Sequence, residues 1–169
     1  MGNGIAHVFA QSGYQVALFD VSEAALTRAV ATIEKNLDRQ VAKGTLSTAD
    51  KDAALSRIQT VTSLEAAVSQ ADLVVEAATE NEAVKMKIFE DLDRLAPAHC
   101  ILASNTSSLS ITRIAAATQR PEQVIGMHFM NPVPVMKLVE IIRGFKTSDA
   151  TTDAVIRMSE SLGKIAISC

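Results

Sequence analysis

Short apolar runs alternate with helical patterns along this chain, and this alternation constrains the fold more than any other feature. Residues 15–20, 72–76 and 100–103 have the length and composition of strands. Between the first two runs, apolar residues recur at helical spacing from Leu26 to Val41. Strands that alternate with helices form a parallel sheet covered by helices. The sequence therefore predicts an α/β fold with a mostly parallel sheet.

The other elements are predicted in the same way. Ser22 can cap the long helix, which Gly44 ends. Another helix is expected after Ser47 or Thr48. Further strands are predicted over residues 58–62, 124–129, 138–142 and 165–167, and further helices over residues 1–10, 84–95, 109–117 and 151–162.

Composition narrows the class of protein. A chain of 169 residues with 48% hydrophobic and 21% charged residues is an ordinary globular chain, long enough for one domain. Its net charge of −3 and its lack of basic runs argue against nucleic-acid binding. The two cysteines lack metal-ligand spacing, so we expect no metal site and a buried, reduced Cys100. No run could span a membrane and no secretory signal is visible, so we expect a cytoplasmic protein.

A histidine and a glutamate flank a proline-containing turn. His128 lies near the end of one apolar run, and Glu140 follows twelve positions later in the next. Pro132 and Pro134 force a turn between the runs. If the runs are neighbouring strands, the carboxylate can polarise the imidazole, whose unperturbed pKa of roughly 6.5 suits a general base. The sequence therefore predicts a base and its carboxylate partner.

The first twenty residues match part of a dinucleotide-binding unit. Such a unit places the pyrophosphate at a helix N-terminus after a glycine-rich turn, and a carboxylate about 20 residues later binds the ribose. Gly2 begins the predicted helix, and Asp20 ends the following strand eighteen positions later. No arginine follows Asp20, which favours NAD over NADP. The alternative is a small residue for helix packing and an aspartate that closes a strand, and Gly4 is interpreted as a close-packing position.

The first strand of such a unit and its two leading glycines are not in the sequence. We therefore expect a doubly wound (Rossmann-type) sheet that lacks its first strand. That strand is central in the doubly wound fold, so its loss leaves two strand edges exposed.

Several longer motifs carry a family resemblance. Residues 103–109 (Ala-Ser-Asn-Thr-Ser-Ser-Leu) and 126–140 closely resemble the L-3-hydroxyacyl-CoA dehydrogenases, with the bacterial 3-hydroxybutyryl-CoA dehydrogenases as the nearest group. Residues 72–77 and 80–81 extend the match. The resemblance implies an NAD-dependent, reversible oxidation of an acyl-CoA substrate. It also implies that residues 1–169 are an NAD-binding domain, incomplete at its N-terminus.

A fragment of a longer enzyme is expected from this resemblance. The family's helical C-terminal domain, which carries the homodimer interface, would be absent. We therefore expect the isolated chain to bind NAD poorly and to turn over little or no substrate. The alternative function is a non-catalytic NAD-binding or structural relative.

The resemblance also implies residue roles. His128 would take the proton of the substrate 3-hydroxyl, Glu140 would orient its ring, and Ser107 would lie near that hydroxyl and the nicotinamide. The remaining implied contacts are Gly2, Asp20, Glu80, Lys85, Asn105 and Asn131 with the cofactor, and Ser107, Asn131, Asn36 and Lys43 with the substrate.

Four of these residues have simpler alternatives that the sequence leaves open. Ser107 could cap the helix expected near Leu109. Asn105 could be a turn residue, and Lys85 and Lys43 could be solvated helix lysines.

Overall fold

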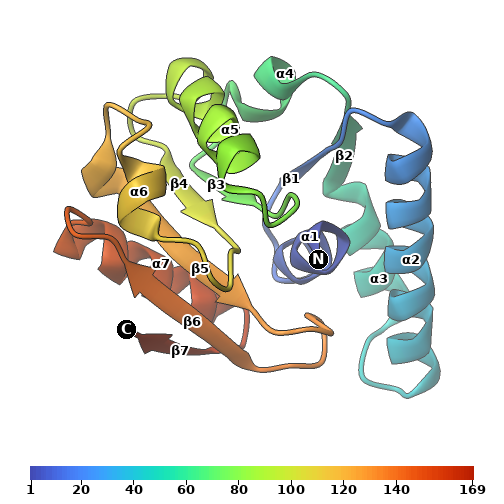
Figure 1. Cartoon of the computed structure of the whole chain (residues 1–169). Helices are drawn as coiled ribbons and strands as arrows, with labels where there is room; N and C mark the ends of the chain where they lie inside the picture. Colours follow the sequence, from blue (N-terminus) through green and yellow to red (C-terminus); the bar gives the residue numbers. More distant parts are fainter. The chain divides into compact units, whose positions relative to one another are not determined.

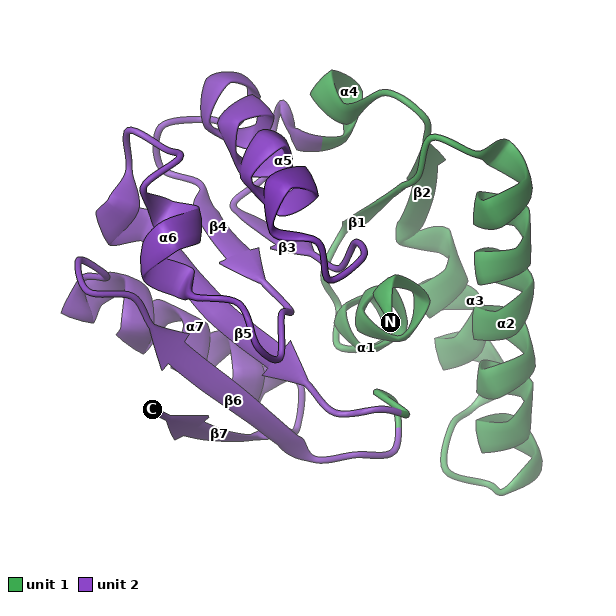
Figure 2. Ribbon diagram, in the orientation of Figure 1, with its two compact units in different colours: residues 1–67, 132–134 green, residues 68–131, 135–169 purple.

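The chain forms two compact units, each an assembly of helices around a sheet. The computed structural model describes all residues, 1–169. One unit comprises residues 1–67 and 132–134, and the other comprises residues 68–131 and 135–169 (Figure 2). Strand pairing is confined within each unit, in a two-stranded and a five-stranded sheet. No strand pair joins the two sheets, and the assignment of residues 1–169 to one domain stays a prediction.

The first unit surrounds a parallel pair of strands. Its elements are α1 (Gly2–Gln11), β1 (Val16–Phe19), α2 (Glu23–Ala42), α3 (Thr48–Ser56) and β2 (Ile58–Val61). The β1 and β2 strands pair from Val16 with Ile58 to Phe19 with Val61. The apolar core between the helices contains Ala6, Ile33, Leu37 and Ala54.

Side-chain caps explain where the helices of this unit begin. The Ser22 hydroxyl accepts a hydrogen bond from the Ala25 amide at 3.2 Å, and Ser47 accepts one from Asp50 at 3.0 Å. The Ser22 cap was predicted, and the structure selects Ser47 from the two residues after which the next helix was expected. The short helix α4 (Leu64–Val68), at the boundary between the units, was not predicted, because one turn presents too little periodicity.

Gly4 is a close-packing position, as the sequence suggested. A β-carbon built on Gly4 would lie 2.9 Å from the β-carbon of Val133. Val133 is nearly fully buried and belongs to the short segment 132–134 that joins the first unit. The proline turn therefore packs against α1 at a residue without a side chain.

The second unit is built on a five-stranded sheet of order β3-β4-β5-β6-β7 (Figure 1). All strand pairs in it are parallel except β5 with β6, which are antiparallel. Its strands are β3 (Leu73–Glu76), β4 (Ile101–Ser104), β5 (Val124–Phe129), β6 (Leu138–Arg143) and β7 (Ile165–Ser168). Its helices are α5 (Glu82–Leu95), α6 (Ile111–Ala115), the 3-10 turn η1 (Pro121–Gln123) and α7 (Asp149–Ser161).

The two faces of this sheet are packed differently. A β-carbon on Gly126 would lie 2.8 Å from the Ile142 β-carbon and 3.2 Å from Ile111 of α6, so this glycine lets α6 approach β5. The opposite face, where Figure 1 shows α7, buries Val139 and Ile141 completely. Because side chains alternate along a strand, His128 and Glu140 lie on the face of Gly126 and Ile142.

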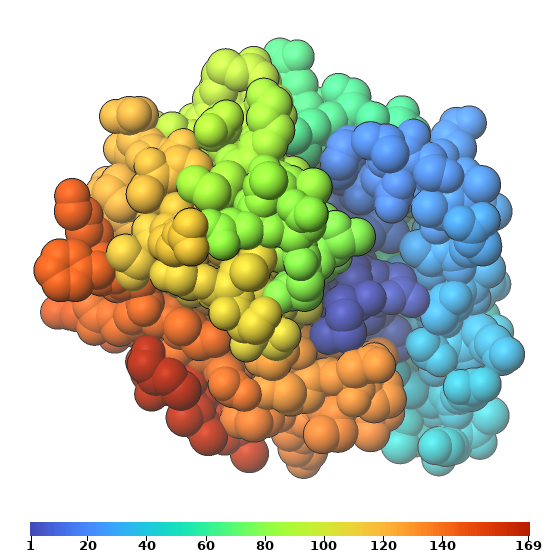
Figure 3. Space-filling model, in the orientation of Figure 1, coloured from blue at the N-terminus to red at the C-terminus, as the bar shows by residue number.

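Each sheet ends in strands that are paired on one side only. β1 is an edge of the first sheet and β3 an edge of the second, and these two strands do not pair with each other. The other edge of the second sheet is β7, where Ile165 and Ile167 are 59% and 50% exposed. In Figure 3 this last strand, in dark red, lies on the visible surface. None of the helices is both long and apolar enough to cross a membrane.

A partly buried arginine closes the end of this sheet where β4 begins. Arg120 donates to the Asp93 carboxylate at 2.9 Å and to the carbonyl oxygens of Pro97 and Cys100 at 2.6 and 3.3 Å. These bonds tie the end of α5 to the start of β4. The cluster is structural and serves below as a control.

The two cysteines are expected to differ sharply in reactivity. Burial raises the pKa of the Cys100 thiol to about 11, and Cys169 is exposed. Because the thiolate is the reactive form, Cys100 should resist thiol reagents near neutral pH. Titration with an aromatic disulfide reagent should label one thiol in the native protein and two in denaturant. Two rapidly labelled thiols in the native protein would contradict the buried position of Cys100.

Candidate active site

The histidine and glutamate predicted as a pair are direct partners across two strands. His128 of β5 lies opposite Glu140 of β6 in the antiparallel register. The imidazole Nδ1 is 3.8 Å from Glu140 Oε1, and the two side chains are 20% and 37% exposed. That distance is longer than a hydrogen bond, and catalytic hydrogen bonds are often long without ligand. The sheet thus places a carboxylate where it can offset the charge of an imidazolium.

Asn105 holds the backbone beside this histidine. Its Oδ1 accepts a hydrogen bond from the Phe129 backbone amide at 2.8 Å, and its own backbone amide donates to the Glu76 main-chain carbonyl oxygen at 2.8 Å. Asn105 follows β4 directly and therefore links the ends of three strands. This geometry favours a structural turn role, and the predicted cofactor contact stays a prediction.

Ser107 lies exposed in the loop after β4, and it does not cap the next helix. The cap of α6 is Ser110, whose hydroxyl accepts from the Arg113 amide at 3.3 Å. The alternative interpretation of Ser107 as a helix cap is therefore wrong. Asn131, also exposed, lies in the turn that follows β5. The side chains of Ser107 and Asn131 are thus accessible to a ligand.

Glu80 fixes the loop that carries Ser107. Its Oε2 accepts hydrogen bonds from the hydroxyls of Thr106 at 2.7 Å and Ser108 at 3.0 Å, one residue on either side of Ser107. Partial burial by itself raises the pKa of Glu80, but these two hydrogen bonds and nearby Lys85 outweigh it and lower the pKa. Glu80 is therefore a carboxylate at neutral pH, and its Oε2 is bonded to the loop that carries Ser107.

Lys85 lies inside the protein rather than on a ligand-facing surface. Its side chain is 1% exposed, and its Nζ is 2.9 and 2.7 Å from the two carboxylate oxygens of Glu76. The interpretation as a solvated lysine is wrong. A direct contact with the cofactor stays a prediction, and the structure gives it no support because the ammonium is enclosed by protein oxygens.

In the first unit, the predicted cofactor residues stand at the ends of their elements. Gly2 is the first residue of α1, whose N-cap Met1 makes no side-chain capping bond, and a β-carbon on Gly2 would meet no atom within 4 Å. Asp20 directly follows β1, and its Oδ1 accepts from the Ser22 amide at 2.9 Å. An uncapped helix start with open space and an oriented carboxylate fit the pyrophosphate and ribose of a dinucleotide.

The two residues predicted to meet CoA lie seven positions apart on α2. Asn36 is half-buried, and Lys43 is the exposed C-cap residue. Seven residues are close to two helical turns, so both lie near one face of the helix. Their contact with substrate stays a prediction.

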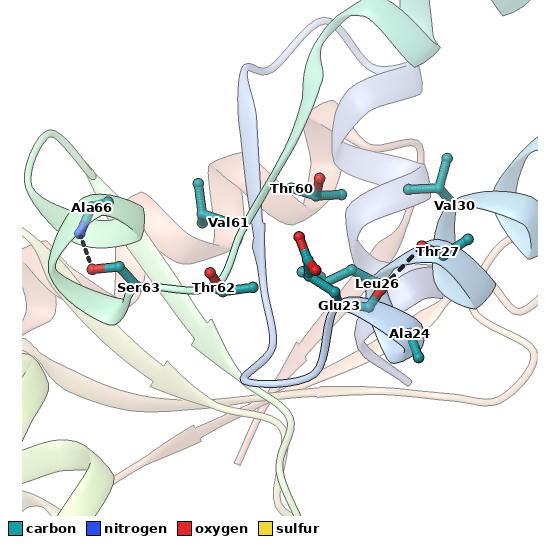
Figure 4. Close-up of a pocket in the computed structure, with 10 residues that line it drawn as sticks. All are labelled: Glu23, Ala24, Leu26, Thr27, Val30, Thr60, Val61, Thr62, Ser63 and Ala66. Carbon is teal, nitrogen blue, oxygen red and sulfur yellow. Dashed lines mark hydrogen bonds between the residues drawn. The ribbon is translucent and has the colours of Figure 1, made fainter.

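A surface pocket of about 800 Å³ also lies in the first unit, and it contains none of the predicted site residues. It is lined by α2, the end of β2 and α4 (Figure 4). Its polar lining consists of Glu23 and the hydroxyls of Thr27, Thr60, Thr62 and Ser63. With a carboxylate and no basic side chain, it does not suit the phosphates of a dinucleotide or CoA.

The hydrogen bond from Thr106 predicts a measurable change in Glu80. Thr106→Val should raise the pKa of Glu80 toward its ordinary value of 4.5, because the larger of the two hydroxyl contributions is lost. A carboxylate with a lowered pKa stabilises the fold above its unfolded pKa, roughly 4.3, and this contribution disappears as pH falls through the folded pKa. The variant should therefore lose less stability on acidification.

Carbon-detected NMR titration of the Glu80 carboxyl measures this shift directly. Ser108→Ala is the graded control, since its bond is longer and its contribution ranks second. An unchanged Glu80 titration in both variants would show that the loop hydroxyls do not bind this carboxylate.

The fold and these residues define a dinucleotide-binding domain of the Rossmann type. Residues 1–169 match the family model of the 3-hydroxyacyl-CoA dehydrogenase NAD-binding domain over their full length. The chain therefore belongs to this family, and NAD is the cofactor that membership indicates. The family predicted from the sequence motifs is confirmed.

Individual relatives agree with the family match. The chain is 52% identical over 169 residues to a 3-hydroxybutyryl-CoA dehydrogenase of Bradyrhizobium diazoefficiens, covering 99% of this chain and 57% of the relative. It is 48% identical over 167 residues to a probable 3-hydroxybutyryl-CoA dehydrogenase of Bacillus subtilis, covering 99% and 58%. The crystal structure of (S)-3-hydroxybutyryl-CoA dehydrogenase from Ralstonia eutropha superposes with a TM-score of 0.97 at 50% identity, covering 99% and 59%. The chain thus spans less than two thirds of each.

Proposed function

We propose that this chain supplies the NAD-binding and base-carrying part of an enzyme that reversibly oxidises an L-3-hydroxyacyl-CoA, 3-hydroxybutyryl-CoA in particular, to the 3-oxoacyl-CoA. The observation that carries the proposal is the register of β5 and β6, which sets His128 opposite Glu140. The names of the Bradyrhizobium and Bacillus relatives support the substrate class.

The residues of this chain account for the proton in this reaction. His128 accepts the proton of the 3-hydroxyl, and Glu140 stabilises the imidazolium that forms. Ser107 and Asn131 hold the substrate oxygen near the imidazole. When bound, NAD supplies an acceptor for the hydride that leaves carbon 3. Asp20 would hold its adenosine ribose, and the first turn of α1 at Gly2 would meet its pyrophosphate.

This division of labour also accounts for the electrons of the reaction. Proton removal leaves the electron pair on oxygen, and the carbon–oxygen double bond forms as the hydride departs. The rate depends on how precisely the substrate is positioned, because the imidazole and the hydride acceptor must both be in reach of the same carbinol group. Asn36 and Lys43 on α2 are proposed to bind the CoA moiety.

A chimera provides the direct test. Residues 1–169 would replace the matching 57% of the Bradyrhizobium relative, and NADH absorbance would be followed with 3-hydroxybutyryl-CoA. We expect turnover within about tenfold of the parent enzyme. Intact NADH binding without turnover would instead favour the second candidate function, a non-catalytic NAD-binding relative.

The isolated 169-residue chain is the second arm of this experiment. We expect it to bind NADH weakly and to turn over little or no substrate. We also propose that the complete enzyme is cytoplasmic and homodimeric. Light scattering of the chimera would test the homodimer.

A further inference from the structure

A buried ion pair lies next to the proposed active site without forming part of it. Lys85 and Glu76 bury their side chains to 1% and 3% exposure, with Nζ 2.7 Å from Oε2. Removing two charges from water is costly, and well-packed apolar residues often serve stability equally well. Stability alone therefore does not explain this ion pair, and its contacts with neighbouring segments indicate its role.

Glu76 ties together the ends of two neighbouring strands. It is the last residue of β3, and its Oε1 accepts a hydrogen bond from the Ser104 hydroxyl, at the end of β4, at 2.7 Å. Its Oε2 accepts from the Ala78 amide at 2.6 Å, which shapes the loop that leads to Glu80. Glu76 is thus bonded to the starts of both loops that carry predicted site residues.

Lys85 joins Glu76 to the loop of Glu80. Besides Glu76, its Nζ lies 3.3 Å from the Ala78 carbonyl oxygen and 3.5 Å from Glu80 Oε1. Glu80 in turn binds the hydroxyls of Thr106 and Ser108. The loop around Ser107 is therefore held from two sides, by Glu76 through Ser104 and by Glu80.

The same set of bonds reaches the proposed base. The Glu76 carbonyl oxygen accepts from the Asn105 amide, and the Asn105 side chain accepts from the amide of Phe129, the neighbour of His128. Every step from Glu76 to this amide is a hydrogen bond of 2.8 Å. The main chain at the end of β3 is thus linked to the amide next to His128, while the Glu76 side chain bonds Ser104 and Lys85.

We propose that Glu76 is a positioning residue of the dehydrogenase reaction, acting with Lys85 and Ser104. It touches neither substrate nor cofactor, and it fixes Ser107 and His128 relative to each other. Small displacements of reacting groups are costly in rate, so loss of this anchor should affect turnover more than folding. This inference rests on the proposed function.

The decisive variant is Ser104→Ala, which removes the side-chain hydrogen bond between Ser104 and Glu76 and leaves the strand pairing and the ion pair intact. In the chimera, we expect kcat to fall at least tenfold while KM for NAD changes less than threefold. Ser159→Ala is the matched control, because Ser159 is also fully buried and donates a 2.9 Å bond to the Val155 carbonyl oxygen on α7. The control should keep kcat within twofold.

Glu76→Gln is the second variant, with Asp93→Asn in the Arg120 cluster as its control. Both variants weaken an ion pair, which is fully buried for Glu76 and Lys85 and partly buried for Asp93 and Arg120. Only the first should lower kcat at least tenfold at temperatures where both proteins remain folded. Unchanged kcat in Ser104→Ala and folded Glu76→Gln would overturn the inference, as would equal losses in the controls.

Hydrogen exchange gives a readout that does not need activity. In the isolated chain and in the chimera, Ser104→Ala should speed exchange of the Asn105 and Phe129 amides at least tenfold, and Ser159→Ala should not. Absence of turnover in the parent chimera would refute the proposed function alone, since exchange still reports the positioning. Unchanged exchange at both amides would refute the positioning role even in an active enzyme.

Discussion

His128→Gln in the chimera is expected to lower kcat for 3-hydroxybutyryl-CoA by about 10³-fold, within the range of 10²–10⁴ that a general base contributes. Glutamine can hydrogen-bond the substrate hydroxyl but cannot accept its proton at neutral pH. The fold should survive, because the side chain is 20% exposed and lies at the end of its strand, past the packing of α6 on Gly126. Steady-state kinetics with NADH detection measure the loss.

The affinity of the variant for NADH distinguishes the loss of a general base from a disturbed active site. Since His128 is proposed to act on the substrate, the NADH dissociation constant should stay within about twofold of the parent, measured by NADH fluorescence. Turnover that persists at the parent level would remove His128 from the mechanism. A parallel loss of NADH binding would indicate that the variant disturbs the fold.

Glu140→Gln should give the next largest effect, a decrease in kcat of about 10²-fold. The amide keeps the size of the side chain but removes the charge that offsets the imidazolium 3.8 Å away. KM for the substrate should change little, because the benefit of the charge arises only as the proton is transferred.

A double variant tests whether the two residues act together. If Glu140 works only through His128, Glu140→Gln should cost almost nothing further in the His128→Gln background. Additive losses would mean that Glu140 contributes independently of the histidine. A neighbouring control is Arg143→Gln at the far end of β6, which should leave kcat within about twofold.

The sequence predicts most of the fold because the local signals and the tertiary structure agree. Ser22 caps the helix that it was predicted to cap, and the next helix begins after Ser47, one of the two expected starts, since a hydroxyl can satisfy an amide of the first turn. The strand runs were placed to within one or two residues. The antiparallel pairing of His128 with Glu140 follows from the proline turn, which joins two apolar runs too closely for a crossover helix.

The charged interior could not be predicted from apolar periodicity. That pattern assigns Val84 to the buried face of α5, whereas the structure leaves Val84 44% exposed and buries Lys85. A lysine is rarely buried completely unless an anion pairs with it, and the anion here, Glu76, is on another element. The one available signal was the position of Glu76, a charge at the end of an apolar strand.

The serines of the loop after β4 illustrate a second limit. Ser107, Ser108 and Ser110 are equally good helix caps by residue type. Which one caps depends on Thr106 and Glu80, because their bond sets the course of the loop before α6 begins. Only the tertiary structure separates the residue that caps from the one left facing outward.

The position of β6 has a consequence for how such a protein can diverge. This strand is paired on both sides, with Glu140 opposite His128 of β5 and beside Ile167 of β7. Its alignment is therefore set by its neighbours and by the buried Val139 and Ile141, not by the number of residues in the turn before it. Related proteins can therefore differ in the turn beyond Asn131 and still keep His128 opposite Glu140.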